Sequence, residues 1–263
     1  MSPVTSYDDD LRLAHVLADA AERVTLPRFR AQDLVVEAKP DLTLVSDADR
    51  SAEEVIRGQL GRTRPRDAVI GEEFESTGHA RRRWIIDPID GTHNYVRGVP
   101  VWATLIALVD GDDPVVGLVA APALGRRWWA ASGSGAWAGR SLTSASRLHV
   151  SGVSRLADAS ISLASVTSWD DVGRTEAVLD LARDCWRERG FGDFWSYMLL
   201  AEGSVDIAAE PELNLYDMAA LAPIVTEAGG RFTSLSGAEG PFGGNALATN
   251  GRLHDEVLAR IGF

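Results

Sequence analysis

Cysteine is almost absent from the 263-residue chain, which holds a single one, Cys185. One thiol excludes an internal disulfide framework and a cysteine-rich zinc site. Cys185 lies in the helix-like run LDLARDCWRER, where a buried and unreactive thiol is the ordinary interpretation. The scarcity of cysteine fits a reducing compartment, and we expect a cytoplasmic protein.

Long hydrophobic runs are also missing. No window approaches the roughly 18 uninterrupted apolar residues of a membrane-spanning helix, so we expect no contact with a membrane. The first residues, MSPVTSYDDDLRLAHV, lack a basic region followed by an apolar stretch. They therefore do not resemble a secretory signal.

Positive charge is in short supply, because 26 Lys and Arg residues face 38 Asp and Glu residues and the formal net charge is −12 at pH 7. This balance argues against nucleic-acid binding. Arg126, Arg127, Trp128 and Trp129 resemble a basic-aromatic patch, but among strands we expect them to be core and surface residues. An acidic protein can still act on an anionic substrate if bound cations first reverse the local field.

The first half of the chain, residues 1–147, is predicted to hold two helices followed mostly by strands. Apolar residues at helical spacing predict a helix that ends near Pro27. Ser46 and Asp49 form a capping-box pattern ahead of a second helix, which Gly61 would end. Strands are expected at DAVIG and RWIID, and then in a meander formed by VWATLIALV, PVVGLVAAP and RRWWAAS.

The second half, residues 148–263, alternates between strand and helix patterns, which indicates an α/β arrangement. Strands are expected at SISLAS, VDIAAE and RFTSL, and helices at RTEAVLDLARDCWRER, SYMLLAEG, DMAALAPIVTEAGG and LHDEVLARIG. No internal repeat or low-complexity linker is present. We therefore expect an α/β protein with an α+β first half and an α/β second half that share an extensive interface.

Two carboxylates stand at the end of a buried strand in WIIDPIDGTHNY, where Asp87 and Asp90 precede the turn residue Gly91. Carboxylates at such a strand end are hard oxygen ligands suited to Mg²⁺. Glu72 follows another strand-like run, and Asp217 begins the helix pattern DMAALAPIVTEAGG. Strand ends and a helix start can converge, and acids brought together would repel one another unless cations bound them.

Each of these signals has an ordinary structural explanation. An aspartate such as Asp217 at a helix start is usually an N-cap, and the pair Asp90–Gly91 is usually a turn. A calcium-binding loop does not fit, because Ile89 stands where an oxygen ligand is needed and no Glu occupies the twelfth position. A P-loop is absent from the sequence.

Taken in order, KPDLTLVSDAD, IGEE, WIIDPIDGTHNY and LYDMAALAPIVTEAGG resemble the motifs of the inositol monophosphatase family of Mg²⁺-dependent, lithium-sensitive phosphatases. The resemblance spans nearly the whole chain. It implies a layered αβαβα fold, a homodimer, and two to three Mg²⁺ ions per site.

The resemblance also implies the metal ligands. Glu72, Asp87 and the carbonyl of Ile89 would bind a first Mg²⁺, and Asp87, Asp90 and Asp217 would bind a second. Glu72 would also help to hold a weaker third ion. On this basis a metal-activated water attacks phosphorus while the second ion stabilises the leaving alkoxide.

Five residues would handle the phosphate and the attacking water. The resemblance implies that the backbone amides of Gly91 and Thr92 bind the phosphate, with Lys39 near its oxygens. Thr92 and Glu72 would position the water, and Asp49 would bond to the Thr92 hydroxyl. These are the expected catalytic and phosphate-binding residues.

Segments around these motifs resemble the members of the family that hydrolyse histidinol phosphate, among them APALGRRWWAA and GFGDFWSYMLLAEG. Glu210 takes the position of a carboxylate that receives substrate hydroxyls in the inositol enzymes. Asp193 adds an acid that suits the cationic histidinol. Asp193 can instead cap a helix, Trp195 can be packing rather than an imidazole stack, and His93 can be a spacer.

The leading hypothesis is therefore a Mg²⁺-dependent hydrolysis of L-histidinol phosphate in histidine biosynthesis. An inositol-1-phosphatase or a broad sugar phosphatase would use the same metal site, and a catalytically silent metabolite- or metal-binding protein is a rival of another class. In the leading hypothesis the protein binds a small phosphate ester and not nucleic acid.

Overall fold

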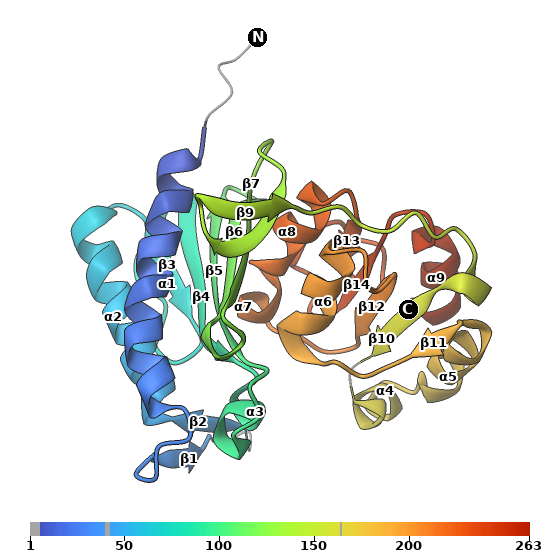
Figure 1. Cartoon of the computed structure of the whole chain (residues 1–263), viewed down its shortest axis with the longest axis horizontal. Coiled ribbons are helices and arrows are strands. Elements are labelled where there is room, and N and C mark those ends of the chain that lie inside the picture. Colours follow the sequence, from blue (N-terminus) through green and yellow to red (C-terminus); the bar gives the residue numbers. More distant parts are fainter. Residues whose placement is uncertain (1–5, 40–42, 164) are drawn as a thin grey trace.

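The computed structural model describes residues 6–39, 43–163 and 165–263. Figure 1 shows two sheets separated by helices, with further helices on both outer sides. The helices α1 and α2 cover one side of the first sheet, α6 to α8 lie between the sheets, and α4, α5 and α9 lie beyond the second sheet. The layered αβαβα fold expected from the motifs is confirmed.

The first layer is an antiparallel pair, α1 (Asp8–Arg28) and α2 (Asp47–Thr63), which together pack on the sheet. The inner face of α1 is mostly alanine and leucine, so the two helices approach closely. Ser46 and Asp49 form the predicted capping box at the start of α2. The helix runs two residues past Gly61, because a glycine does not by itself stop a helix whose apolar face is buried.

The first sheet has seven strands in the order β3-β4-β5-β6-β7-β8-β9. β3 pairs with β4 in parallel, and the remaining neighbours form an antiparallel meander. The last two strands of the meander were not predicted, because glycine, serine and arginine leave little alternation there. The strands are β3 (Ala68–Gly71), β4 (Arg82–Asp90), β5 (Ala103–Asp110), β6 (Asp113–Ala121), β7 (Arg126–Ala131), β8 (Ala136–Ser141) and β9 (Ser144–Arg147).

The basic-aromatic run on β7 divides between core and surface, as expected. Trp128 and Trp129 are buried in the two cores on opposite faces of the sheet. Arg126 pairs with Glu202, and the neighbouring Arg127 pairs with acids of α1.

Two small elements lie at the end of the first sheet. The antiparallel strands β1 (Val36–Ala38) and β2 (Leu44–Ser46) precede α2, and residues 40–42 lie outside the described residues. The short helix α3 (Thr92–Arg97) follows β4 directly.

The second sheet has five strands in the order β11-β10-β12-β14-β13. β10 pairs in parallel with β11 and β12, and β14 pairs antiparallel with β12 and β13. The strands are β10 (Ser160–Leu163), β11 (Arg187–Glu188), β12 (Ile207–Glu210), β13 (Arg231–Thr233) and β14 (Ala246–Thr249). The helices of this half are α4 (Val166–Asp171), α5 (Thr175–Asp184), α6 (Asp193–Ala201), α7 (Leu215–Met218), α8 (Leu221–Glu227) and α9 (His254–Ile261). Short 3₁₀ turns are η1 (Pro122–Leu124) and η2 (Leu156–Asp158).

Two expected helices differ from those observed. The helix expected over 174–189 ends at Asp184, and the residues after Cys185 pair with β10 as β11, so the prediction of a continuous helix is wrong. The helix expected over 217–230 is two helices, α7 and α8, and Asp217 lies inside the first rather than at its start.

The two sheets share a core with the middle helices. Ile85 and Trp128 of the first sheet belong to the same buried cluster as Tyr197, Ile224 and Phe232. The first sheet ends at Arg147, next to the expected division at 147/148, and the division of the chain into two halves stays a prediction. None of the helices in the described part of the chain combines the length and apolar character needed to cross a bilayer.

Candidate metal-dependent active site

A cavity of about 450 Å³ opens at the end of β4, between α3, α7 and the start of α6. Its wall holds most of the site residues expected from the sequence, although these are spread over more than 170 positions of the chain. They are Lys39, Glu72, Asp87, Ile89, Asp90, Gly91, Thr92, Asp193 and Asp217.

β4 delivers its acids to the cavity because its last residues leave the regular ladder. The pairing with β5 shifts register between Asp87 and Asp90, a bulge that includes Pro88. The Thr104 hydroxyl donates to the Pro88 carbonyl at 2.8 Å and ties the bulge to β5. Ile89 is buried, so its side chain anchors the strand end while the neighbouring carboxylates line the cavity.

Three carboxylates meet there. Asp87, Asp90 and Asp217 each offer an oxygen within 4.8 Å of the others. The second oxygen of two of them is already held, because Asp90 Oδ2 accepts the Phe194 N–H at 2.8 Å and Asp217 Oδ2 accepts the Asn214 N–H at 2.7 Å. Asp87 Oδ1 is buried and has no hydrogen-bond partner. This unpaired buried oxygen among hard donors fits a divalent cation such as Mg²⁺.

The raised pKa values of the clustered acids also favour a bound cation. Burial first, and the charge of Glu72 second, raise the pKa of Asp87 well above its usual range. Burial and the charge of Asp193 do the same to Asp90, and burial raises the pKa of Asp217 to about 7. Acids held this close resist ionisation together, and a bound cation would remove that penalty.

Glu72 stands beside the cluster and is held by the only lysine of the chain. Lys39 Nζ donates to Glu72 Oε1 at 2.8 Å and to Glu73 Oε1 at 2.7 Å. The turn that carries both acids is also fixed by α2, because Glu53 Oε2 accepts the Glu73 N–H at 2.8 Å. Glu53 fits there only because Gly71 has no side chain, since a Cβ on Gly71 would lie 2.0 Å from Glu53 Oε1.

The turn after β4 places a hydroxyl between two acceptors. Thr92 Oγ1 lies 3.0 Å from the Ile89 carbonyl oxygen and 3.3 Å from Asp49 Oδ1. Asp49 is fully buried and also accepts the Ser46 N–H at 2.8 Å in the capping box of α2. Burial raises the pKa of Asp49 to about 6. Asp49 therefore reaches the site through Thr92 and does not line the cavity.

A model of the inositol monophosphatase family matches residues 7–261. The chain belongs to the inositol monophosphatase family.

Several relatives match nearly the full length of the chain. A protein of Streptomyces coelicolor named histidinol-phosphatase is 66% identical over 97% of this chain and 97% of its own. A histidinol-phosphatase of Mycobacterium tuberculosis is 56% identical over 96% of this chain and 98% of its own. The structure of an inositol monophosphatase from Zymomonas mobilis superposes with a TM-score of 0.85 at 31% identity, covering 98% of this chain and 99% of that one.

The two expected substrate residues occupy different places. Asp193 lines the cavity at the start of α6, whereas Glu210, at the end of β12, does not form part of the cavity wall. Burial raises the pKa of Glu210 to about 8, and the charge of Asp193 adds to the effect. Glu210 thus lies near Asp193 but outside the cavity wall.

Sequence reasoning missed six residues of the wall or left them undecided: Thr43, Leu44, His93, Asn94, Asn214 and Tyr216. The last four lie within three residues of an expected site residue, in α3 or within or beside α7. Their positions in these short helices could have suggested them, but a single turn of helix is hard to orient from sequence alone.

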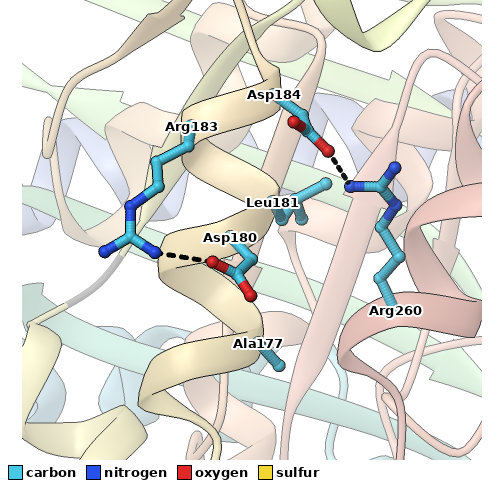
Figure 2. A pocket seen from close by; sticks show the side chains of 6 residues that line it. All are labelled: Ala177, Asp180, Leu181, Arg183, Asp184 and Arg260. Atoms are coloured by element: carbon cyan, nitrogen blue, oxygen red, sulfur yellow. Dashed lines mark hydrogen bonds and ion pairs between the residues drawn. The ribbon is translucent and has the colours of Figure 1, made fainter.

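A second cavity, of about 480 Å³, lies between α5 and α9 and is shown in Figure 2. Its charged side chains are engaged with one another, because Arg183 pairs with Asp180 and Arg260 with Asp184. No described acid cluster of the metal-binding kind lies there. Among the described residues, the acid cluster that could hold a metal ion lies at the end of β4.

Proposed function

We propose that the protein is a Mg²⁺-dependent phosphomonoesterase that hydrolyses L-histidinol phosphate to L-histidinol and phosphate, a step of histidine biosynthesis. The observation that carries this proposal is the identity of 66% and 56%, over nearly full length, to proteins named histidinol-phosphatase. The acidic cavity supports it, because a phosphate ester is an anion that such a site can accept only with cations.

Glu72, Asp87 and the Ile89 carbonyl would hold one Mg²⁺, and Asp87, Asp90 and Asp217 a second, with Glu72 contributing to a third. The meeting of the three aspartates and the unpaired Asp87 Oδ1 support the second set. When bound, the ions supply charge stabilisation for the phosphoryl group and the leaving oxygen, and they make a bound water more acidic.

The chain's own residues would bind and orient the ester. The amides of Gly91 and Thr92 stand at the first turn of α3, where a helix leaves its N–H groups without internal partners. Lys39 would add positive charge near the phosphate oxygens. Thr92 Oγ1 would hold the attacking water together with Glu72, and Asp49 would orient the Thr92 hydroxyl, a role that their 3.3 Å separation supports.

Asp193 would attract the cationic part of the substrate. L-Histidinol carries an amine and an imidazole, whereas inositol is neutral, so a carboxylate on the wall favours the former. Glu210, whose pKa burial raises to about 8, would stand near Asp193 as a protonated acid at neutral pH. We further propose a cytoplasmic homodimer that lithium inhibits, on the basis of the family resemblance.

The test is phosphate release with saturating Mg²⁺ from L-histidinol phosphate and from myo-inositol 1-phosphate. We expect kcat/KM to favour L-histidinol phosphate by about 100-fold or more, which corresponds to about 2.7 kcal/mol of transition-state discrimination. Equal values or the reverse preference would identify an inositol-1-phosphatase or a broad sugar phosphatase. Mg²⁺ binding with no release of phosphate from any ester would identify a silent binding protein.

A further inference from the structure

The side chain of Asn94 joins two segments that are 99 residues apart in sequence. Its amide nitrogen Nδ2 donates to Asp193 Oδ2 at 2.9 Å and to the Val101 carbonyl oxygen at 2.9 Å. Both hydrogens of the amide are therefore used, and neither is left for a substrate. Asn94 thus connects α3, which begins at the phosphate-binding turn, with the first residue of α6.

The backbone of Asp193 has a restricted conformation. Asp193 is one of only two described residues other than glycine with a positive φ, at 48°. Its carboxylate packs on the turn after β4, because a Cβ on Gly91 would lie 3.3 Å from Asp193 Oδ2. A left-handed aspartate costs about 1 kcal/mol relative to a right-handed one. The surrounding contacts must therefore hold it there, and the bond from Asn94 is the one that reaches its carboxylate.

The two oxygens of Asp193 differ in their surroundings. Oδ2 accepts from Asn94, whereas Oδ1 accepts no hydrogen bond from any described residue. Oδ1 is also not among the buried atoms that lack a partner, and Asp193 lines the cavity. Oδ1 is therefore the oxygen that a ligand in the cavity can reach.

The same segment is fixed to the metal-binding region. The N–H of Phe194, the next residue, donates to Asp90 Oδ2 at 2.8 Å. Asp193 is therefore held on one side through the backbone beside it and on the other through Asn94. A carboxylate fixed in this way keeps a set distance from a phosphate bound at the turn after β4.

We infer that Asn94 is a positioning residue that orients the Asp193 carboxylate and so sets the preference of the site for phosphate esters of cationic alcohols over those of neutral alcohols. This inference rests on the proposed function. Both N–H groups of Asn94 donate to protein oxygens, so none is left to donate to the ester. Removal of Asn94 frees Asp193 to turn away, and the ester then loses a preset contact for its ammonium or imidazolium group.

The test is a double-mutant cycle with Asn94→Ala, Asp193→Ala and the double variant. The measured quantity is the ratio of kcat/KM for L-histidinol phosphate to kcat/KM for myo-inositol 1-phosphate. We expect Asn94→Ala to lower this ratio about tenfold, mainly by raising KM for L-histidinol phosphate. The double variant should be no less selective than Asp193→Ala alone, because Asn94 acts only through Asp193.

Asn250 provides the matched control. Its Nδ2 also donates to one backbone carbonyl, that of Val153, and to one side-chain oxygen, Ser151 Oγ, at a site remote from the cavity. Asn250→Ala should lower stability and leave the selectivity ratio unchanged. If Asn94→Ala does not fold, Asn94→Leu, which is similar in size and has no donor, takes its place in the cycle.

The outcomes separate the two proposals. A wild type without preference for L-histidinol phosphate removes the proposed function and this inference together. A selective wild type overturns the inference alone if Asn94→Ala keeps the wild-type ratio, if the losses of the two single variants multiply, or if Asn250→Ala lowers the ratio equally.

Discussion

Replacing Asp90 by asparagine should make the metal-free protein more stable and at the same time remove most of its activity. The reason is the crowding of charge, since Asp87, Asp90 and Asp217 offer oxygens within 4.8 Å of one another. At an effective dielectric constant of about 20, two ionised carboxylates 4.8 Å apart repel by about 3.5 kcal/mol. The substitution removes this repulsion toward both neighbours.

The expected gain is smaller than the full repulsion. The raised pKa values of Asp87 and Asp90 mean that protons already relieve part of it at neutral pH. Asparagine has nearly the shape of aspartate, and its Oδ1 can still accept the Phe194 N–H. We therefore expect the free energy of unfolding to rise by about 1–3 kcal/mol, or about 2–4 °C in Tm per kcal/mol.

The assay is thermal unfolding in EDTA and again in Mg²⁺, together with phosphate release. The wild type should gain stability on adding Mg²⁺, by about 2.7 kcal/mol at 100 times the Kd, and Asp90→Asn should lose most of this gain. Its kcat/KM should fall about 100-fold or more. Asp112→Asn removes the same charge at a fully exposed position and should change none of these quantities.

The reasoning is refuted if Asp90→Asn is no more stable than the wild type in EDTA, because the carboxylates then do not strain the fold. The assignment of Asp90 to a metal is refuted if the variant keeps the full stabilisation by Mg²⁺ and wild-type turnover.

Three further predictions concern the surrounding structure. Gly117→Ala should lower the free energy of unfolding by about 1–3 kcal/mol in urea titration. The reason is that a Cβ there would lie 2.2 Å from the Ala220 carbonyl oxygen, between α7 and α8. A variant as stable as the wild type would contradict this packing. Gly71→Ala should lower kcat and stability together, because its Cβ would displace the Glu53 carboxylate that holds the turn after β3, and unchanged turnover would count against that role. Burial lowers the pKa of His254 from 6.5 to about 4, so the unfolded chain takes up a proton first as the pH falls. The contribution of His254 to the free energy of unfolding should therefore be fully present above about pH 6.5 and should fall by up to about 3 kcal/mol toward pH 4. Urea titrations at pH 7 and 4.5 test this, because His254→Gln should remove this part of the decrease.

Local patterns in the sequence predicted the parts of the fold that depend on neighbouring residues. The capping box of Ser46 and Asp49 fixed the start of α2, and the apolar run before Asp87 predicted β4. The failed prediction of a helix past Cys185 depends on pairing with a distant strand. The helical pattern that continues past Cys185 is overridden because the backbone there bonds to β10, and no local signal contains that partner.

The candidate site shows the same division. The ligands expected from the family motifs lie on one cavity wall. They include Asp217, whose position depends on a helix far along the chain. The bond from Asn94 to Asp193 could not be predicted, because it spans 99 residues and depends on the left-handed backbone of Asp193. Glu210 was expected among the substrate residues, and its place outside the wall depends on how far β12 reaches.

The burial of β4 explains why its acids stand where they do. Residues Trp84 to Ile89 are buried without the polar alternation of a half-exposed strand, because helices cover both faces, α2 on one side and α7 on the other. An acid in the middle of such a strand would be enclosed without water or cation. At the strand end, the bulge after Asp87 turns the chain toward the cavity, where a cation can reach the unpaired oxygen. The same covering layers that stabilise the sheet therefore hold the three aspartates in a water-poor environment, in which a bound cation is attracted more strongly than it would be at the surface.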